Sequence, residues 1–153
     1  MARIRRISVL VLMFILGLSL FSYCKPVEIA ELVDNFQRGT GLQKDQLVKD
    51  NLGKEISASG IVSDAGEYDY FDTANDLKGT YYQVITEQQK TKNNIPYQVI
   101  FLFKDKDTVK DIDKGENIQK EGKIIRIMDE RLQIAVWIFC GELTEKDKAL
   151  FKL

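Results

Sequence analysis

The side chains most able to take part in binding lie together in residues 64–79, which read DAGEYDYFDTANDLKG. Aromatic rings supply rigid contact area at an interface, and carboxylates can bind a basic or hydroxyl-rich partner. We therefore predict that this segment contacts a ligand. The predicted contact residues are Tyr68, Asp69, Tyr70, Phe71 and Asp72.

Two other interpretations of the same segment remain open. Its carboxylates could hold a hard cation such as Ca²⁺, although their spacing does not match an EF-hand loop. Alternatively, the segment is a solvated loop whose aromatic side chains pack against the domain, since long loops are often but not always functional.

The absence of histidine restricts the chemistry available to the chain. It excludes Ser-His-Asp and Cys-His nucleophiles and every His-ligated metal site. The short glycine pair Gly39-Thr40-Gly41 lacks the Lys-Ser/Thr that follows a phosphate-binding loop. We therefore expect a protein that is not an enzyme and that holds no metal or cofactor. Carboxylate chemistry is the remaining enzymatic alternative, and only the abundance of Asp and Glu supports it.

The N-terminus has the pattern of an export signal. Arg3, Arg5 and Arg6 precede an almost wholly apolar run at residues 7–21. This run of 15 residues is shorter than the roughly 20 that a membrane-spanning helix needs. The pattern therefore predicts a secretory signal, and an uncleaved membrane anchor is the alternative.

Residues 18–24, LSLFSYC, resemble the end of a bacterial lipoprotein signal, in which a cysteine follows small residues and becomes the lipid-modified first residue. The resemblance implies a signal at residues 1–23, cleavage before Cys24, lipid on Cys24, and anchoring to a membrane of the cell envelope. Tyr23 stands where a small residue is usual. A secreted or periplasmic soluble protein, cleaved before Leu20, is therefore the alternative.

The net charge depends on whether the signal is removed. The whole chain has 22 basic and 23 acidic residues, and residues 1–24 contain three basic and no acidic ones. The mature chain therefore has 19 basic and 23 acidic residues, a net charge of −4. Domains that bind nucleic acid usually carry a surplus or a stripe of positive charge, so we do not expect nucleic acid as a partner.

The second cysteine, Cys140, lies in an apolar run, which predicts a small residue of the core. If Cys24 is retained without lipid, a disulfide between Cys24 and Cys140 is the alternative.

Hydrophobic periodicity predicts two helices followed by five strands. The helices cover residues 27–37 and 43–52, and the strands cover residues 56–62, 80–86, 97–103, 118–128 and 132–140. Residues 105–115 form a charged connector from which Val109 and Ile112 can reach the core. Gly122, inside the fourth strand, predicts a bulge or bend of the kind that closes small barrels.

The last strand and the C-terminus add two expectations. Alternation places Leu132, Ile134, Val136, Ile138 and Cys140 on one face. Trp137 is out of phase with this face, so it is predicted either to contact a ligand or to cover the barrel beneath a helix. Residues 144–147 resemble a capping start for a last helical turn, with Leu150 and Leu153 able to pack.

Three segments of the chain resemble the tRNA_anti-like group of OB-fold domains. They are residues 53–62 (GKEISASGIV), 109–122 (VKDIDKGENIQKEG) and 138–143 (IFCGEL). The resemblance implies a five-stranded barrel, but it does not imply tRNA binding, because the group's name reflects similarity of fold.

The expected fold class is therefore mainly β, or α+β by content, with a five-stranded OB-like barrel preceded by two short helices. The expected regions are the signal at 1–23, a helical lead-in at 24–53, the barrel at 54–143 and a helical turn at 144–153. We expect an exported, lipid-anchored, non-enzymatic module that binds a protein or carbohydrate partner in the cell envelope. A nucleic-acid-binding OB domain is the alternative.

Overall fold

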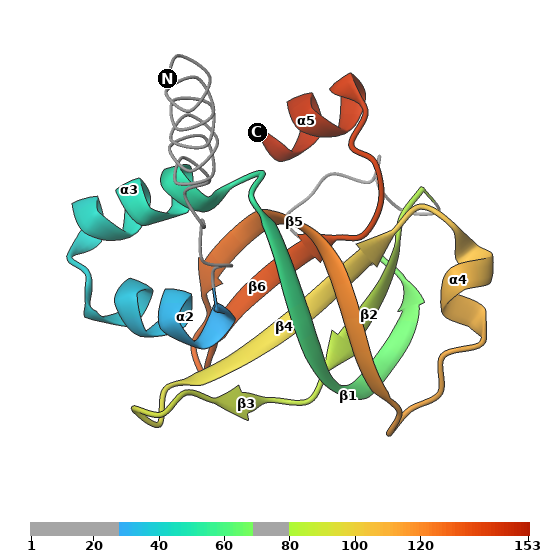
Figure 1. The fold of residues 1–153 in the computed structure, drawn as a ribbon, viewed down its shortest axis with the longest axis horizontal. Helices are drawn as coiled ribbons and strands as arrows, with labels where there is room; N and C mark the ends of the chain where they lie inside the picture. The colour runs from blue at the N-terminus through green and yellow to red at the C-terminus, as the bar shows by residue number, and fades with distance from the viewer. Residues whose placement is uncertain (1–27, 69–79) are drawn as a thin grey trace, which may run out of the picture.

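The computed structural model describes residues 28–68 and 80–153, which form a barrel with helices at its ends (Figure 1). Two helices come first, α2 (Ile29–Arg38) and α3 (Gly41–Asn51). The elements that follow are β1 (Glu55–Glu67), β2 (Tyr82–Thr86), β3 (Gln89–Lys90), β4 (Pro96–Phe103), α4 (Lys106–Lys110), β5 (Asn117–Asp129), β6 (Ile134–Phe139) and α5 (Glu145–Phe151). None of the described helices is long and apolar enough to span a membrane.

The strands close into a ring. They pair in the order β2-β1-β5-β6-β4, and β2 also pairs with β4. The pair β4–β6 is parallel, and the other pairs of the ring are antiparallel. This is an OB-like barrel of five strands after two helices, which confirms the predicted fold class. The two-residue strand β3 extends the sheet beside β4.

The longest strands, β1 and β5, bend so that each can serve two neighbours. β1 pairs with β5 through its first half and with β2 through its second half, with an irregularity between Val62 and Asp64. β5 has a similar irregularity between Ile124 and Arg126. Bulges of this kind increase strand twist and curvature, which a small barrel requires. Gly122 precedes the second irregularity, and β6 passes close to it.

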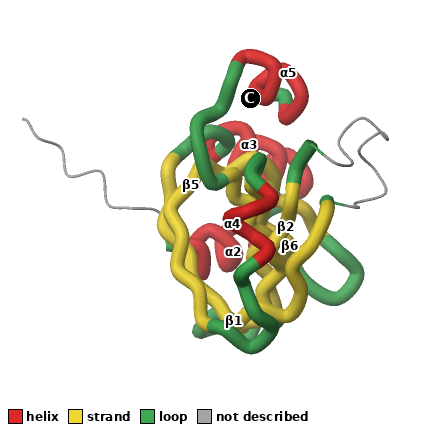
Figure 2. The backbone as a smooth tube through the Cα atoms, turned by 90° about the vertical axis from the view of Figure 1, so that its right-hand side faces the viewer, coloured by secondary structure: helices red, strands yellow, loops and turns green. Residues whose placement is uncertain are grey.

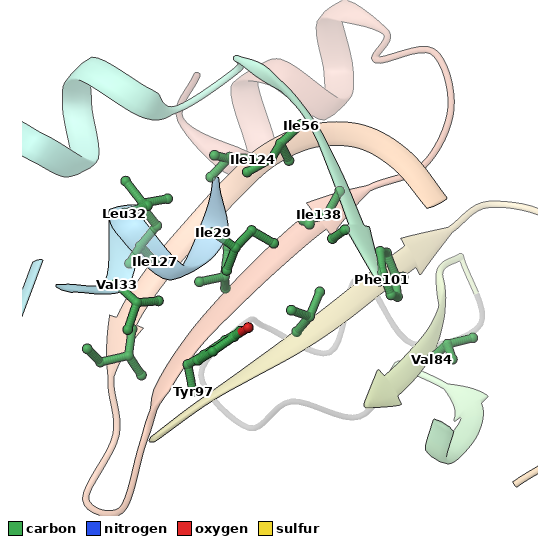
Figure 3. Close-up of a cluster of buried hydrophobic side chains, with 14 of the residues drawn as sticks. Ile29, Leu32, Val33, Ile56, Val84, Tyr97, Phe101, Ile124, Ile127 and Ile138 are labelled. Carbon is green, nitrogen blue, oxygen red and sulfur yellow. The ribbon is translucent and has the colours of Figure 1, made fainter. Parts of the chain in front are cut away.

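The barrel core is lined by inward-facing residues of all five ring strands, and α2 fills one end of it. Ile29, Leu32, Val33 and Phe36 form the predicted apolar face of this helix, and all four are buried. Figure 3 shows three of them lying over the isoleucines of β1 and β5. Leu47 and Val48 of α3 and Leu52, which directly follows it, are partly buried against the same core, as predicted.

The connector at residues 105–115 contains a helix, α4, that the periodicity did not indicate. Asp105 begins it by accepting a hydrogen bond from the Asp107 N–H at 3.0 Å. Val109 is buried in the barrel core, as expected. α2 and α4 lie on opposite sides of the barrel (Figures 1 and 2). These two helices cover opposite ends of the barrel, so we expect a ligand to bind on its outer surface.

A second apolar cluster lies on the outside of β4, β5 and β6. This outer cluster consists of Tyr68, Tyr81, Ile100, Leu102, Ile125, Ala135, Trp137 and Phe139. Helix α5 packs on part of it and begins with the predicted capping box, formed by Thr144 and Asp147. The residue of α5 that packs is Phe151; Leu150 and Leu153, which were expected to pack, are 37% and 39% exposed. The outer cluster gives the barrel a second apolar layer.

The start of the last strand also differs from the prediction. Leu132 was expected to face inward, but its side chain is 82% exposed and β6 begins at Ile134. A tight turn, in which the Glu130 N–H donates to the Gln133 carbonyl at 2.9 Å, takes Leu132 out of the strand. The inward face from Ile134 to Cys140 is confirmed.

Candidate functional site

The predicted recognition segment, residues 64–79, is partly inside the sheet. β1 continues past its irregularity to Glu67, so Asp64 and Glu67 pair with Ile85 and Tyr82 of β2. The Tyr68 N–H then donates to the Tyr81 carbonyl at 3.0 Å. The predicted contact residues Asp69, Tyr70, Phe71 and Asp72 lie outside the described residues, as does the predicted lipidation site Cys24. The loop between β1 and β2 is therefore shorter than the segment of residues 64–79 that was predicted from the sequence.

Two predicted contact residues are in the interior instead of on the surface. Tyr68 is 4% exposed and Trp137 is 1% exposed, and both belong to the outer cluster. For Trp137 this is the covering role that its phase in the strand left open. Tyr68 is buried because β1 runs further than the periodicity indicated and carries it to the edge of the cluster, and its contact with a ligand stays a prediction.

The pairing of strands places outward-facing side chains in rows across the barrel. One row runs Ile85, Ile100, Trp137 and Arg126, from β2 through β4 and β6 to β5. The Arg126 guanidinium lies 5.3 Å from the Trp137 ring, a cation–π distance. The side chains in this row are apolar except for the one cation at its end.

Tyr81 and Phe139 lie under α5, and a buried carboxylate holds this helix to the barrel. Asp147 is 2% exposed and accepts hydrogen bonds from the Tyr81 hydroxyl, from Lys104 Nζ at 2.5 Å and from the Thr144 hydroxyl and N–H at 2.6 Å each. The rings of Tyr81, Phe139 and Phe151 meet edge-on or tilted at centroid distances of 5.7–6.2 Å. The other residues of α5 are exposed. The helix is therefore attached mainly through Asp147 and Phe151.

At this attachment the pKa values of Asp147 and Tyr81 are shifted in opposite directions. Burial alone would raise the pKa of Asp147, but the hydrogen bonds from Lys104, Thr144 and Tyr81 outweigh it and hold the pKa below its ordinary range. Burial, the hydrogen bond to Asp147 and its charge raise the pKa of Tyr81 well above the ordinary value. At neutral pH Asp147 is thus a carboxylate and Tyr81 a neutral donor. This arrangement suits a structural clamp, because neither group changes its protonation near neutrality.

Three glutamines form a continuous chain of side-chain amides on the outside of the barrel. Gln88 Nε2 donates to Gln133 Oε1 at 3.0 Å, and Gln133 Nε2 donates to Gln98 Oε1 at 2.7 Å. Gln98 Nε2 then donates to the Thr86 carbonyl at 2.7 Å. We call Gln88, Gln98 and Gln133 the glutamine strip. It joins the end of β2, the start of β4 and the turn before β6.

A groove of about 260 Å³ adjoins the glutamine strip at the turn between β5 and β6. It is lined by the end of α2, the turn before β4 and the β5–β6 turn, with Ile95, Pro96, Leu132 and Gln133 among its residues. Asp129 on its rim is paired with Lys44 at 2.8 Å. The neutral amides of the strip therefore lie beside a groove that is lined by apolar side chains, including the exposed Leu132, and by the charged side chains of Asp129, Glu130 and Arg131.

A larger cleft of about 380 Å³ lies on the other side of the barrel, between β1, β5 and Gly141. Glu55, Ser57 and Glu121 line it, and all three side chains are exposed. In residues 28–68 and 80–153 there is no cluster of three or more potential metal ligands. Nearby Cys140 is half-buried, and burial raises the pKa of its thiol to about 12. A thiol with that pKa is a poor nucleophile.

The glutamine strip and the Asp147 clamp were not found from the sequence. The three glutamines are isolated in sequence and follow no period, so no local pattern marks them. Asp147 was recognised as a helix cap, but its bonds to Tyr81 and Lys104 depend on where α5 docks. The sequence signal for the clamp was the capping box itself, which marked Asp147 as a hydrogen-bonding residue at the start of the last helix.

No protein-family model matches the chain, and no curated protein matches it either. One similar solved structure is described as a "putative nucleic acid-binding lipoprotein" from Klebsiella pneumoniae subsp. pneumoniae MGH 78578. It is 16% identical, the similarity covers 74% of this chain and 87% of that chain, and the TM-score is 0.46. A similarity of this extent carries no inference about the function of the present chain.

Proposed function

We propose that this chain is an exported, lipid-anchored, non-enzymatic module that binds a partner in the cell envelope through the outside of its OB-like barrel. The proposed partner is a protein or a carbohydrate. The export and lipid signals of the sequence support the compartment. The observation that supports the binding role is the outward face of β2 and β4, where the glutamine strip and the half-buried Ile85 lie beside the buried residues Ile100 and Trp137.

This face lies where OB barrels bind their ligands. The strands equivalent to β2 and β4, with the two connections beside them, form the binding surface of oligonucleotide- and oligosaccharide-binding OB-folds. In this chain those connections are residues 68–81, which include much of the predicted recognition segment, and the β5–β6 turn, which borders the groove. The proposal therefore combines the sequence prediction with a described surface.

Nucleic acid is the less favoured partner. Binding of single strands uses exposed rings for base stacking and a basic groove for the phosphates. Among residues 28–68 and 80–153 no aromatic side chain is exposed, and only Tyr82 and Phe151 are half-buried. Lys104, a cation at the end of β4, is already paired with Asp147. Titration with single-stranded DNA at low salt tests this alternative, because low salt strengthens phosphate attraction.

Site-specific photo-crosslinking in the native bacterium tests the binding face. A benzophenone side chain replaces Ile85, Met128 or Tyr70 in separate full-length variants, and Gln119 in a control. Gln119 is exposed on β5, on the solvated side of the barrel next to β1. We expect the first three variants to form one shared crosslinked species that the Gln119 variant does not form.

The chemistry of that species identifies the partner class. Protease digestion removes a protein adduct, a glycan-cleaving enzyme removes a carbohydrate adduct, and nuclease removes a nucleic acid adduct. A nuclease-sensitive species would replace the proposal with its alternative. The same species at Gln119, or no species at any position, would show that this face is not the binding surface.

Lipid attachment is tested by replacing Cys24 with serine. Several acyl chains anchor a protein stably, whereas a protein without them has no comparable membrane affinity. We expect the wild-type protein in the membrane fraction, with Cys24 as an acylated first residue by intact-mass analysis. The Cys24→Ser protein should lose the lipid mass and leave the membrane unless its signal stays uncleaved, while the control Cys140→Ser should keep both. An unmodified wild-type chain beginning at Leu20 would contradict this prediction.

A further inference from the structure

The glutamine strip has hydrogen-bonding groups that its internal bonds do not use. A glutamine amide has two N–H donors and an oxygen that can accept two hydrogen bonds. Gln88 uses one N–H, and Gln98 uses one N–H and one acceptor position. The strip therefore offers alternating donors and acceptors to a ligand, and its internal bonds hold them in fixed positions.

The chemistry of the strip favours an uncharged ligand. Its three side chains are neutral, and the charged group bonded to it within the described part of the chain is Glu130, 3.5 Å from Gln133 Nε2. The carboxylate of Asp129 nearby is compensated by Lys44. Phosphate groups would find no cation in the strip itself and, in the groove, Arg131 beside the Glu130 carboxylate, whereas amides and hydroxyls would find partners of their own kind.

The groove supplies an apolar contact beside these amides. At about 260 Å³ it is smaller than the roughly 300–1,000 Å³ of typical small-molecule sites, so it suits a single side chain better than a whole ligand. Ile95, Pro96 and Ile134 contribute apolar atoms to it. Leu132 on its rim is 82% exposed, and contact with an apolar group would remove that surface from water.

We propose that the glutamine strip and the adjoining groove bind an extended segment of a partner protein. The backbone amides of the segment bond to Gln88, Gln98 and Gln133, and one apolar side chain enters the groove against Leu132. An extended polypeptide combines regularly spaced neutral amides with apolar side chains, which is the pairing that this surface offers. An oligosaccharide supplies hydroxyls for the strip but no apolar side chain for the groove.

This inference rests on the proposed function and narrows it to one ligand class and one part of the face. The test begins with selection from a phage-displayed library of random peptides on the mature domain. The selected peptides are then titrated into ¹⁵N-labelled protein. We expect them to share one apolar residue and to shift the backbone resonances of residues 94–98 and 129–134, with the side-chain amides of the strip.

Matched variants separate the strip from the rest of the surface. Gln133→Met keeps the size of the side chain and removes its amide, and Leu132→Ser removes the apolar contact. Each should weaken peptide binding by about tenfold, the loss that one or two hydrogen bonds or a leucine contact produces. Gln119→Met on the other side of the barrel should leave the affinity unchanged. A spectrum unaltered away from the substitution shows that each variant folds.

Three results would overturn the inference. The first is a library that enriches no peptide, and the second is a set of shifts confined to another surface. The third is a set of shifts at the strip with a neutral oligosaccharide such as maltohexaose but with no peptide. In each case crosslinking from Ile85, Met128 or Tyr70 still decides the proposed function separately, because none of these residues belongs to the strip or groove.

Discussion

Replacing Gly122 with alanine is expected to destabilise the barrel by about 3 kcal/mol or more, the upper range for overpacking a close-packed site. A Cβ atom at this position would lie 2.4 Å from the Phe139 carbonyl oxygen and 2.7 Å from Ile138 Cγ2. The oxygen belongs to the backbone of β6, so relief of the clash requires the two strands to separate. The free energy of unfolding in urea measures the effect.

Two further glycines provide a graded comparison. At Gly60 a Cβ would lie 2.7–2.8 Å from Thr86 side-chain atoms and from the flexible amide of Gln89, so a smaller loss is expected. At Gly66, also in β1, no atom lies within 4 Å of the added Cβ. Gly66→Ala should therefore cost less than about 1 kcal/mol or stabilise slightly, since glycine weakens a strand interior. Equal stability of the Gly122 and Gly66 variants would show that the approach of β6 is not tight.

Replacing Asp147 with alanine is expected to lower the free energy of unfolding by about 3 kcal/mol and to release α5 from the barrel. The substitution removes the acceptor for Tyr81, Lys104 and Thr144. It leaves the Tyr81 hydroxyl buried without this acceptor, which carries the desolvation penalty. Alanine is the best helix former, so an intrinsic loss of helicity does not explain the result. A seven-residue helix is not stable without tertiary contacts, so release and unfolding of α5 should coincide.

The matched control is Asp107→Ala. Asp107 is also in the first turn of a short helix and is bonded to a lysine, Lys110, at 2.9 Å, but it is 76% exposed. Surface pairs of this kind contribute about 0–1 kcal/mol. Urea unfolding compares the two variants, and hydrogen exchange shows whether the amides of α5 lose protection. If both variants lose the same stability, Asp147 is not a clamp.

The contribution of Asp147 to stability depends on pH with a defined sign. Because the pKa of Asp147 is lowered in the folded protein, its contribution is complete above the unfolded pKa of about 3.9 and declines as pH falls below it. The stability difference between wild type and Asp147→Ala should therefore be constant near neutrality and shrink in acid. The pKa of Tyr81 is raised in the wild type, and absorbance titration should show it moving down toward its ordinary value in the variant.

Much of the fold was predictable because it depends on local pattern. The apolar face of α2 and the alternation of Ile134, Val136 and Ile138 each follow from the geometry of one element. The errors occur where a tertiary contact overrides a local preference. Leu132 continues the alternation of β6 but is exposed because the Glu130–Gln133 turn precedes the strand. The second half of β1 does not continue the alternation of buried and exposed residues of the first half. A bulge between Val62 and Asp64 shifts the register where β1 pairs with β2.

The candidate site was less predictable than the fold. The acidic and aromatic segment was visible as a cluster in the sequence, and its end at Tyr68 proved to be an interior position. The glutamine strip has no comparable signal, since glutamine is common on protein surfaces and the three residues come from different elements. A local pattern can identify a loop rich in contact-forming residues, but it cannot identify a surface assembled from distant segments.

The sequence by itself determined the absence of histidine and the order of the two leading helices and the five barrel strands, and it predicts the export signal and the acidic charge of the chain after the signal is removed. These properties depend on composition or on neighbours within one element. Tertiary structure alone decided that Trp137 is interior, that Asp147 bonds to Tyr81 and that Gln98 meets Gln133. The bonded pairs are 66 and 35 positions apart in the chain, and barrel closure brings them together. Contacts between such distant residues depend on strand register and helix docking, which no local pattern contains.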